Sequence, residues 1–220
     1  MSSLFLFPIF FGEILSIYFL SRLVLRKAYG LLSRFGSKKM IVGIISFLYL
    51  PGTITHELSH YFAAVFLNMR THEVSIFPVI EEKKIKLGHV IYEKNPGDFL
   101  RPILIGIAPL FGALITLSLI VYTKQFPGKE LWQTVVFGYL ILAITANMFS
   151  SAQDLVDVIY LIPIGIIIAL LLYLFPFSIP THYLSIISNA VNLFLQTIQP
   201  ALLFSIVLHV ILVAILSRLQ

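Results

Sequence analysis

The chain consists of long apolar stretches separated by short polar connections. A membrane-spanning helix needs about 20 mostly apolar residues. The hydrophobic pattern predicts spans at residues 4–25, 40–67, 101–122, 131–149, 154–174 and 200–216. Residues 181–197 mix apolar side chains with Ser, Asn and Gln, which favours a separate interfacial or polar-faced helix. The pattern therefore predicts an all-α polytopic membrane protein with about six transmembrane helices.

Two interruptions of the apolar pattern predict local structure. Pro51-Gly52 falls inside the second span, and proline inside an apolar helix kinks it, so we expect a kink there. Residues 73–92 alternate in places between apolar and polar side chains, which is typical of strands. We expect a short β-hairpin or small sheet between the second and third spans.

The composition agrees with a membrane location. Of the 220 residues, 59% are hydrophobic and 11% are charged, whereas a soluble domain carries about 25% charged residues. We expect residues 1–220 to form a single integral membrane domain, as a multi-pass protein of a prokaryotic cell membrane. The net charge of +5 does not indicate nucleic-acid binding, because membrane loops are commonly rich in Lys and Arg. The expected partners are the lipid bilayer and a membrane protein or peptide substrate, with no nucleic acid.

The candidate chemistry lies in the HExxH sequence His56-Glu57-Leu58-Ser59-His60. Residues four apart lie on one face of a helix, so both imidazoles can ligate one Zn²⁺. Glu57 would lie beside the metal, where it can take a proton from an activated water molecule. Two His and a Glu are costly to bury in hydrocarbon, which makes them functional candidates. The chain contains no cysteine, so any metal must be held by His and carboxylates.

A catalytic zinc usually has three protein ligands, and the sequence leaves the third one open. His72 and His89 lie in the expected hairpin, where a solvated surface role is the simpler interpretation. His209 is alone on an apolar helix, where it is expected to be a packed or a lipid-facing residue. Asp154 and Asp157 lie at the hydrophobic boundary after the fourth span. They either supply the third ligand or only cap and solvate the next helix.

The two motifs occupy compatible depths in the membrane. The second and fourth spans run parallel if the third returns between them. His56 then lies about 24 Å along its span, at a rise of 1.5 Å per residue, and Asp154 follows the end of the fourth span. Both would therefore lie toward the same face of the membrane.

Residues 55–60, together with the hairpin after them, resemble the site-2 protease family of intramembrane zinc metalloproteases. In that family the second span carries HExxH, and a later span carries an Asn followed about two turns on by an Asp, the third ligand. Asn147 and Asp154 match this order, although the Leu-Asp-Gly sequence of the family is absent and Asp157 stays an alternative. The resemblance covers about residues 40–157, as in a divergent member.

The resemblance implies a zinc metalloendopeptidase that hydrolyses peptide bonds within or beside the membrane. Its cofactor would be Zn²⁺, held by His56, His60 and Asp154, with Glu57 activating the water. The hairpin edge would hold an unwound substrate, and Asn147 is a candidate for hydrogen bonding to that extended backbone. The catalytic end would face the cytoplasm.

The sequence alone leaves other functions open. Membrane peptidases of the prenyl-protein or heat-shock type share HExxH but take a downstream Glu as the third ligand, and no Glu of this chain has the required helical setting. A non-proteolytic metal-binding protein, a transporter or a catalytically inactive adaptor would also account for the motif. A transporter should place polar residues along a path through several spans, whereas here Glu13 stands isolated in the first. The helices at 1–39 and 158–220 would be additions to any such core.

Overall fold

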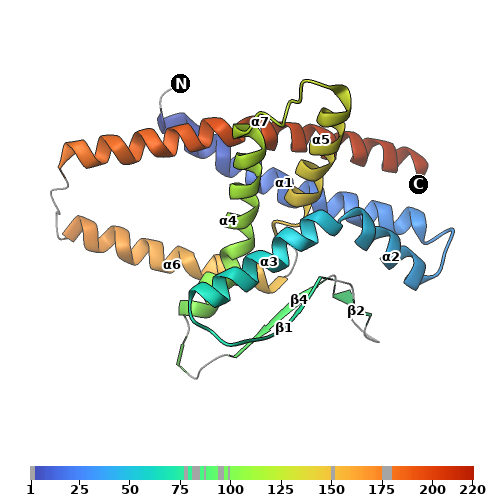
Figure 1. The fold of residues 1–220 in the computed structure, drawn as a ribbon, viewed down its shortest axis with the longest axis horizontal. Coiled ribbons are helices and arrows are strands. Elements are labelled where there is room, and N and C mark those ends of the chain that lie inside the picture. The colour runs from blue at the N-terminus through green and yellow to red at the C-terminus, as the bar shows by residue number, and fades with distance from the viewer. Residues whose placement is uncertain are drawn as a thin grey trace.

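A computed structural model gives the structure of the chain (Figure 1). It describes the backbone of residues 3–76, 79–80, 85–86, 88–93, 97–98, 100–149, 152–174 and 180–220. Side chains are described for residues 6–76, 88–93, 97–98, 100–149, 162–174 and 180–220.

The described residues form seven helices and four short strands. The helices are α1 (Ser3–Leu32), α2 (Lys38–Leu48), α3 (Leu50–Phe66), α4 (Leu100–Tyr122), α5 (Leu131–Ala146), α6 (Ala152–Leu174) and α7 (Thr181–Leu219). The strands are β1 (Thr71–Ser75), β2 (Val79–Ile80), β3 (Ile85–Lys86) and β4 (His89–Tyr92). The mostly helical architecture and the small β structure expected after the second apolar segment are thereby confirmed.

The described helices do not confirm six membrane spans. Three of them are long and apolar enough to cross a membrane, namely Leu6–Leu32 of α1, α4 and α7, and the bent pair of α2 and α3 would make a fourth. Helix α5 is shorter, as is the part of α6 with described side chains, Ile162–Leu174. The predicted separation of residues 181–197 from 200–216 is wrong, because α7 runs through Pro200 as one helix of 39 residues. Within an apolar helix, local adjustments satisfy the backbone groups that a proline frees.

The kink predicted at Pro51-Gly52 is present as a 75° bend between α2 and α3 at Tyr49. Proline fits the first turn of a helix, where its missing N–H has no intrahelical partner to lose. Pro51 therefore lies in the first turn of α3 rather than interrupting it. The bend frees carbonyl groups at the end of α2, and the Tyr139 hydroxyl of α5 donates to Leu48 O at 2.9 Å. The bend is thus held against α5.

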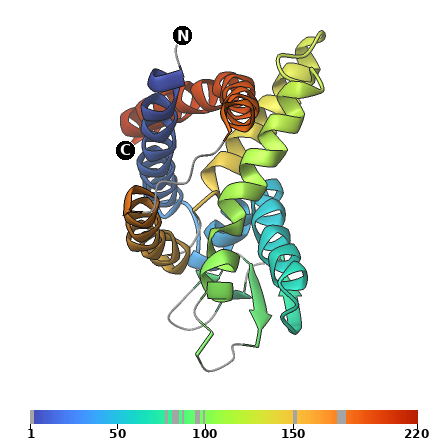
Figure 2. The ribbon, with the colours of Figure 1, turned by 90° about the vertical axis from the view of Figure 1, so that its left-hand side faces the viewer.

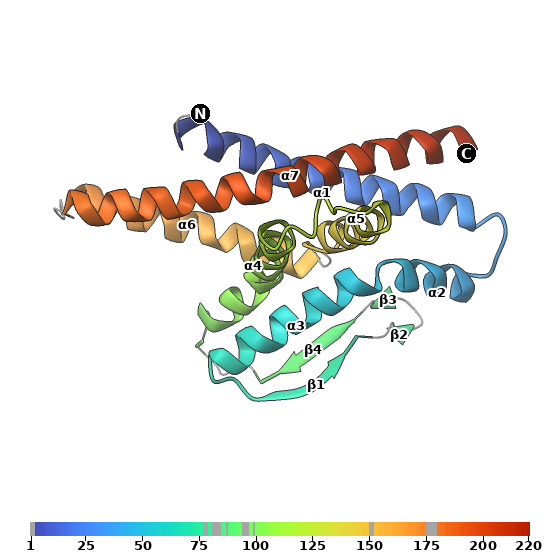
Figure 3. The same ribbon diagram turned by 45° about the horizontal axis from the view of Figure 1, so that its top comes forward.

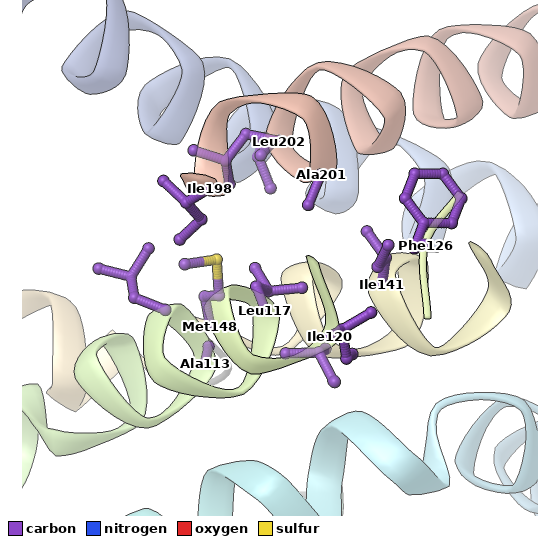
Figure 4. Close-up of a cluster of buried hydrophobic side chains, with 12 residues drawn as sticks. Ala113, Leu117, Ile120, Phe126, Ile141, Met148, Ile198, Ala201 and Leu202 are labelled. Atoms are coloured by element: carbon purple, nitrogen blue, oxygen red, sulfur yellow. The ribbon is translucent and has the colours of Figure 1, made fainter. Parts of the chain in front are cut away.

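The main hydrophobic core lies where α1, α4, α5 and α7 meet (Figure 4). Leu117 of α4, Ile141 of α5 and Leu202 of α7 are completely buried there. In a bilayer such a core is held by close packing rather than by exclusion of water. Figure 2 shows α4 running from the core with α1, α5 and α7 toward α3 and the hairpin. Helix α4 thus links the core to the helix that carries HExxH.

The strands form one hairpin with two antiparallel ladders. β1 pairs with β4, and β2 pairs with β3 farther along the hairpin. A small second core docks the hairpin on α3, where Tyr92 packs against a cluster that includes Ala64 and Ile105. β4 therefore lies along α3 (Figure 3).

Two glycines let neighbouring helices approach α3 closely. A Cβ on Gly52 of α3 would overlap Ala143 O of α5 and the Asn147 side chain, and a Cβ on Gly112 of α4 would overlap Ser59 Oγ. Only a residue without a Cβ permits such contacts. Helix α3 is thus held between α4 and α5 at the level of the HExxH residues.

Candidate metal centre

His56 and His60 lie one turn apart on α3, and Glu57 follows His56 directly. His56 and Glu57 are buried, at 4% and 5% exposure, and His60 is half-buried. Ionisable groups buried in an apolar helix need partners or a metal to offset their desolvation.

Each imidazole is held by a main-chain carbonyl from another part of the fold. His56 Nδ1 lies 2.8 Å from Asn147 O at the end of α5, and His60 Nδ1 lies 2.8 Å from Ile105 O in α4. A carbonyl oxygen only accepts hydrogen bonds, so each Nδ1 carries the proton and donates it. In a neutral imidazole the other nitrogen, Nε2, then carries a lone pair.

The two Nε2 atoms face each other across 3.1 Å, with the ring planes nearly perpendicular at 86°. Two lone pairs at this distance repel each other unless a proton or a metal cation lies between them. A zinc ion with Zn–N bonds of about 2.0–2.1 Å and tetrahedral angles requires Nε2 atoms roughly 3.3–3.4 Å apart. The observed spacing is close to that of two ligands of one ion, so this donor pair fits zinc.

The carbonyl partners are the part of the site that sequence reasoning missed. Histidines that bind metals usually donate their other N–H to a carbonyl or carboxylate, which fixes the tautomer and the ring orientation. Any residue at position 105 provides such a carbonyl, so the sequence carries no signal for it. Asn147 did stand out in the sequence, but for its side chain rather than for its carbonyl.

The predicted third ligands lie on α6. Asp154 and Asp157 fall in the first two turns of this helix, but their side chains are outside the described residues. The choice between them therefore stays a prediction. Among the residues that the structure does describe, no three or more His, Cys, Asp and Glu side chains are arranged so that they could hold one metal ion together.

Other histidines have partners of their own. His72 Nε2 lies 2.9 Å from Glu93 Oε1 on the exposed surface of the hairpin, in keeping with the solvated role expected for it. His89 Nε2 lies 3.7 Å from a hairpin carboxylate. His209 is completely buried, and its Nδ1 lies 2.8 Å from Ser205 O within α7. His209 is therefore a packed residue and does not face lipid.

The main chain at Gly88, immediately before β4, lies against the side chain of Glu57. A Cβ built on Gly88 would fall 2.6 Å from Glu57 Cγ and 2.7 Å from Oε1. The candidate general base is thus enclosed between α3 and the hairpin. No feature of the sequence predicted this contact, because it joins a backbone to a side chain 31 positions away.

The side chain of Asn147 fastens the end of α5 to the α2–α3 bend. Its Nδ2 donates to Ala143 O at 2.9 Å and lies 3.5 Å from Tyr49 O. Asn147 thus supports the site with both its amide group and its carbonyl. Its predicted contact with a substrate stays a prediction.

A small cavity lies beside Asn147, and its lining includes Arg22 of α1, Tyr49 at the bend and Phe149. Arg22 Nη2 donates to Phe149 O at 2.7 Å, which fixes the chain as it leaves α5 toward α6. Helix α1 lies outside the region of family resemblance, yet it supports the segment that carries Asn147.

Comparison with protein-family models, curated proteins and solved structures finds no match to this chain. The resemblance to site-2 proteases therefore rests on features of the sequence alone and stays a prediction.

Proposed function

We propose that the chain is a multi-pass integral membrane zinc metalloendopeptidase of the site-2 protease type, acting on peptide bonds of membrane-associated substrates. The observation that carries the proposal is the pair of Nε2 atoms of His56 and His60, 3.1 Å apart, beside the buried carboxyl group of Glu57. Two imidazoles and a carboxyl group in this arrangement are the parts of a metal-dependent hydrolase. The length and hydropathy of α1, α4 and α7 support the membrane setting.

The cofactor in this proposal is Zn²⁺, held by His56, His60 and Asp154, with Asp157 as the alternative third ligand. When bound, the ion would polarise the scissile carbonyl and ease the deprotonation of water. The carbonyl contacts at the two Nδ1 atoms keep both Nε2 atoms in the ligating tautomer. The protein therefore presents two ligands in a fixed orientation.

Glu57 is the proposed general base. Its carboxylate takes the proton of the attacking water and then donates it to the leaving amine. Its enclosure beneath the hairpin keeps bulk water away, which strengthens its electrostatic interaction with the reacting groups. Helix α3 supplies both the ligands and the base, so their relative positions depend on one rigid element.

The hairpin is the proposed substrate-binding element. A helical substrate hides its backbone hydrogen-bonding groups, so it has to unwind before cleavage. Among the described strands, β4 pairs with β1 on one edge and with no strand on the other. An extended segment can add to such an edge as a further strand. Because β4 lies along α3, this edge would deliver the segment to the HExxH residues.

Cleavage by the purified protein in liposomes tests the proposal, with single-span peptides labelled at both ends as the probe. Glu57→Gln keeps the size of the side chain but cannot accept a proton, so it should retain zinc and lose activity by roughly 10²–10⁴-fold. His182→Gln, at the exposed start of α7, is the matched control and should behave as wild type. Full activity in Glu57→Gln, or a zinc-loaded wild type that cuts none of the peptides, would favour a non-proteolytic metal-binding protein.

A further inference from the structure

Gly88 approaches Glu57 more closely than any other residue type could. A Cβ at this position would lie 2.6 Å from Glu57 Cγ, 2.7 Å from Oε1 and 2.9 Å from Cδ, well inside van der Waals contact. The backbone itself does not demand glycine here, because among the described glycines only Gly97 has a positive φ. The close contact with the Glu57 side chain is what requires glycine.

The segment that carries Gly88 is seated on α3 through β4. Tyr92, at the end of β4, packs against a cluster that includes Ala64, two turns after Glu57 on α3. Two turns of helix rise about 10.5 Å, and four residues of strand extend about 13 Å, so the contacts at Gly88 and Tyr92 are similarly spaced along the strand and the helix. Figure 3 shows β4 following α3 in this way. The packing of β4 on α3 therefore holds the main chain at Gly88 against the Glu57 side chain.

We propose that Gly88 is a positioning residue, which fixes the Glu57 carboxylate relative to the His pair and to the start of β4. The catalytic consequence rests on the proposed function, whereas the contact itself does not. Because Gly88 directly precedes β4, one stretch of main chain sets both the place of Glu57 and the edge that receives the substrate. The base and the scissile bond are thereby aligned by the same strand.

Gly88→Ala tests the placement of the carboxylate. The atoms that the new methyl group meets belong to the flexible end of the Glu57 side chain, so they move while the hairpin stays. A misplacement of about 1 Å can cost roughly a hundredfold in rate. We expect kcat for a labelled single-span peptide to fall by about that factor, with KM and zinc content unchanged. Gly43→Ala, whose Cβ meets nothing within 4 Å, is the control and should match wild type.

Gly88→Val tests the contact without relying on metal or cleavage. Valine is too large for a shift of the carboxylate to accommodate, so the hairpin has to rise from α3, and Glu57→Ala should restore the space. The chain has no cysteine, so Ala64→Cys, buried in the cluster that Tyr92 covers, reports lifting by its rate of reaction with a water-soluble maleimide. We expect Gly88→Val to raise this rate several-fold and added Glu57→Ala to return it to the Ala64→Cys reference.

Two results would overturn the proposal. One is a labelling rate that stays high in the Gly88→Val/Glu57→Ala protein, because the hairpin would then need glycine for its own conformation. The other is a wild-type kcat in Gly88→Ala. Failure of the proposed function gives a different result. The wild-type protein would then cut no peptide, while the labelling rate of the Gly88→Val protein would still depend on Glu57.

Discussion

His56 and His60 present their Nε2 atoms to each other at 3.1 Å, and each ring is fixed at Nδ1 by a carbonyl from a different part of the fold. Helix α3 supplies the two nitrogens, whereas α4 and the end of α5 set their tautomers. The pair is therefore preorganised only while these three elements stay packed. Zinc affinity should respond to substitutions that touch neither imidazole.

Gly52→Ala should weaken zinc binding without changing a ligand. The new Cβ would overlap Ala143 O, so α5 has to move away from α3 and take Asn147 O away from His56. Overpacking typically costs about 1–3 kcal/mol of stability, and loss of a partner behind a ligand lowers metal affinity about 10–100-fold. Thermal unfolding and competition with a zinc chelator measure the two effects.

Gly43→Ala on α2 is the control for that experiment, because its Cβ would meet nothing within 4 Å. It should leave both unfolding temperature and zinc affinity at wild-type values. If Gly52→Ala behaves like this control, the packing of α5 against α3 does not orient His56.

Asp154→Ala and Asp157→Ala should have unequal effects on zinc affinity. The true ligand contributes a bond to the metal, so its loss should lower affinity by well over the roughly 10–100-fold that a supporting residue costs. We expect the larger loss for Asp154→Ala, measured by chelator competition on the purified protein. Small and equal losses would place the third ligand elsewhere, with His89 as the next candidate.

Proline substitutions in β4 test the substrate edge. The N–H groups of successive strand residues point to opposite edges, so of Val90 and Ile91 one faces β1 and the other faces the edge away from β1. Proline removes the N–H. Proline at the residue whose N–H faces β1 should loosen the hairpin, seen as faster labelling of Ala64→Cys. Proline at the other of these two residues should keep the hairpin and the zinc but lose cleavage of a single-span peptide.

Wild-type cleavage by both proline variants would mean that the hairpin only connects α3 to α4. Loss of cleavage only in the variant with a loosened hairpin would assign β4 a structural role.

The local features of the fold could be predicted because each depends on neighbouring residues. The spacing of His56 and His60 places them on one helix face, Pro51 predicts a bend, and the alternation in residues 73–92 predicts strands. The number of spans could not be predicted as well, because hydropathy alone does not show that α7 continues through Pro200.

The support of the site could not be predicted because it is made by backbone groups distant in sequence. Ile105 O and Asn147 O act through atoms that every residue has, so their identity carries no signal. Gly88 contacts Glu57 by lacking a side chain, and a glycine in a hairpin connection is ordinarily read as a turn residue. Only the packing of β4 on α3 shows that Gly88 contacts Glu57.

Zinc content shows most directly whether the two Nε2 atoms form a metal site. We expect about one zinc per chain in the purified protein, by elemental analysis after dialysis against metal-free buffer. His56→Ala/His60→Ala should hold almost none, while His182→Ala, exposed at the start of α7, should keep the wild-type amount. A wild-type protein without zinc, or equal zinc in the double variant, would contradict a metal site and leave a shared proton between the imidazoles as the explanation of their approach.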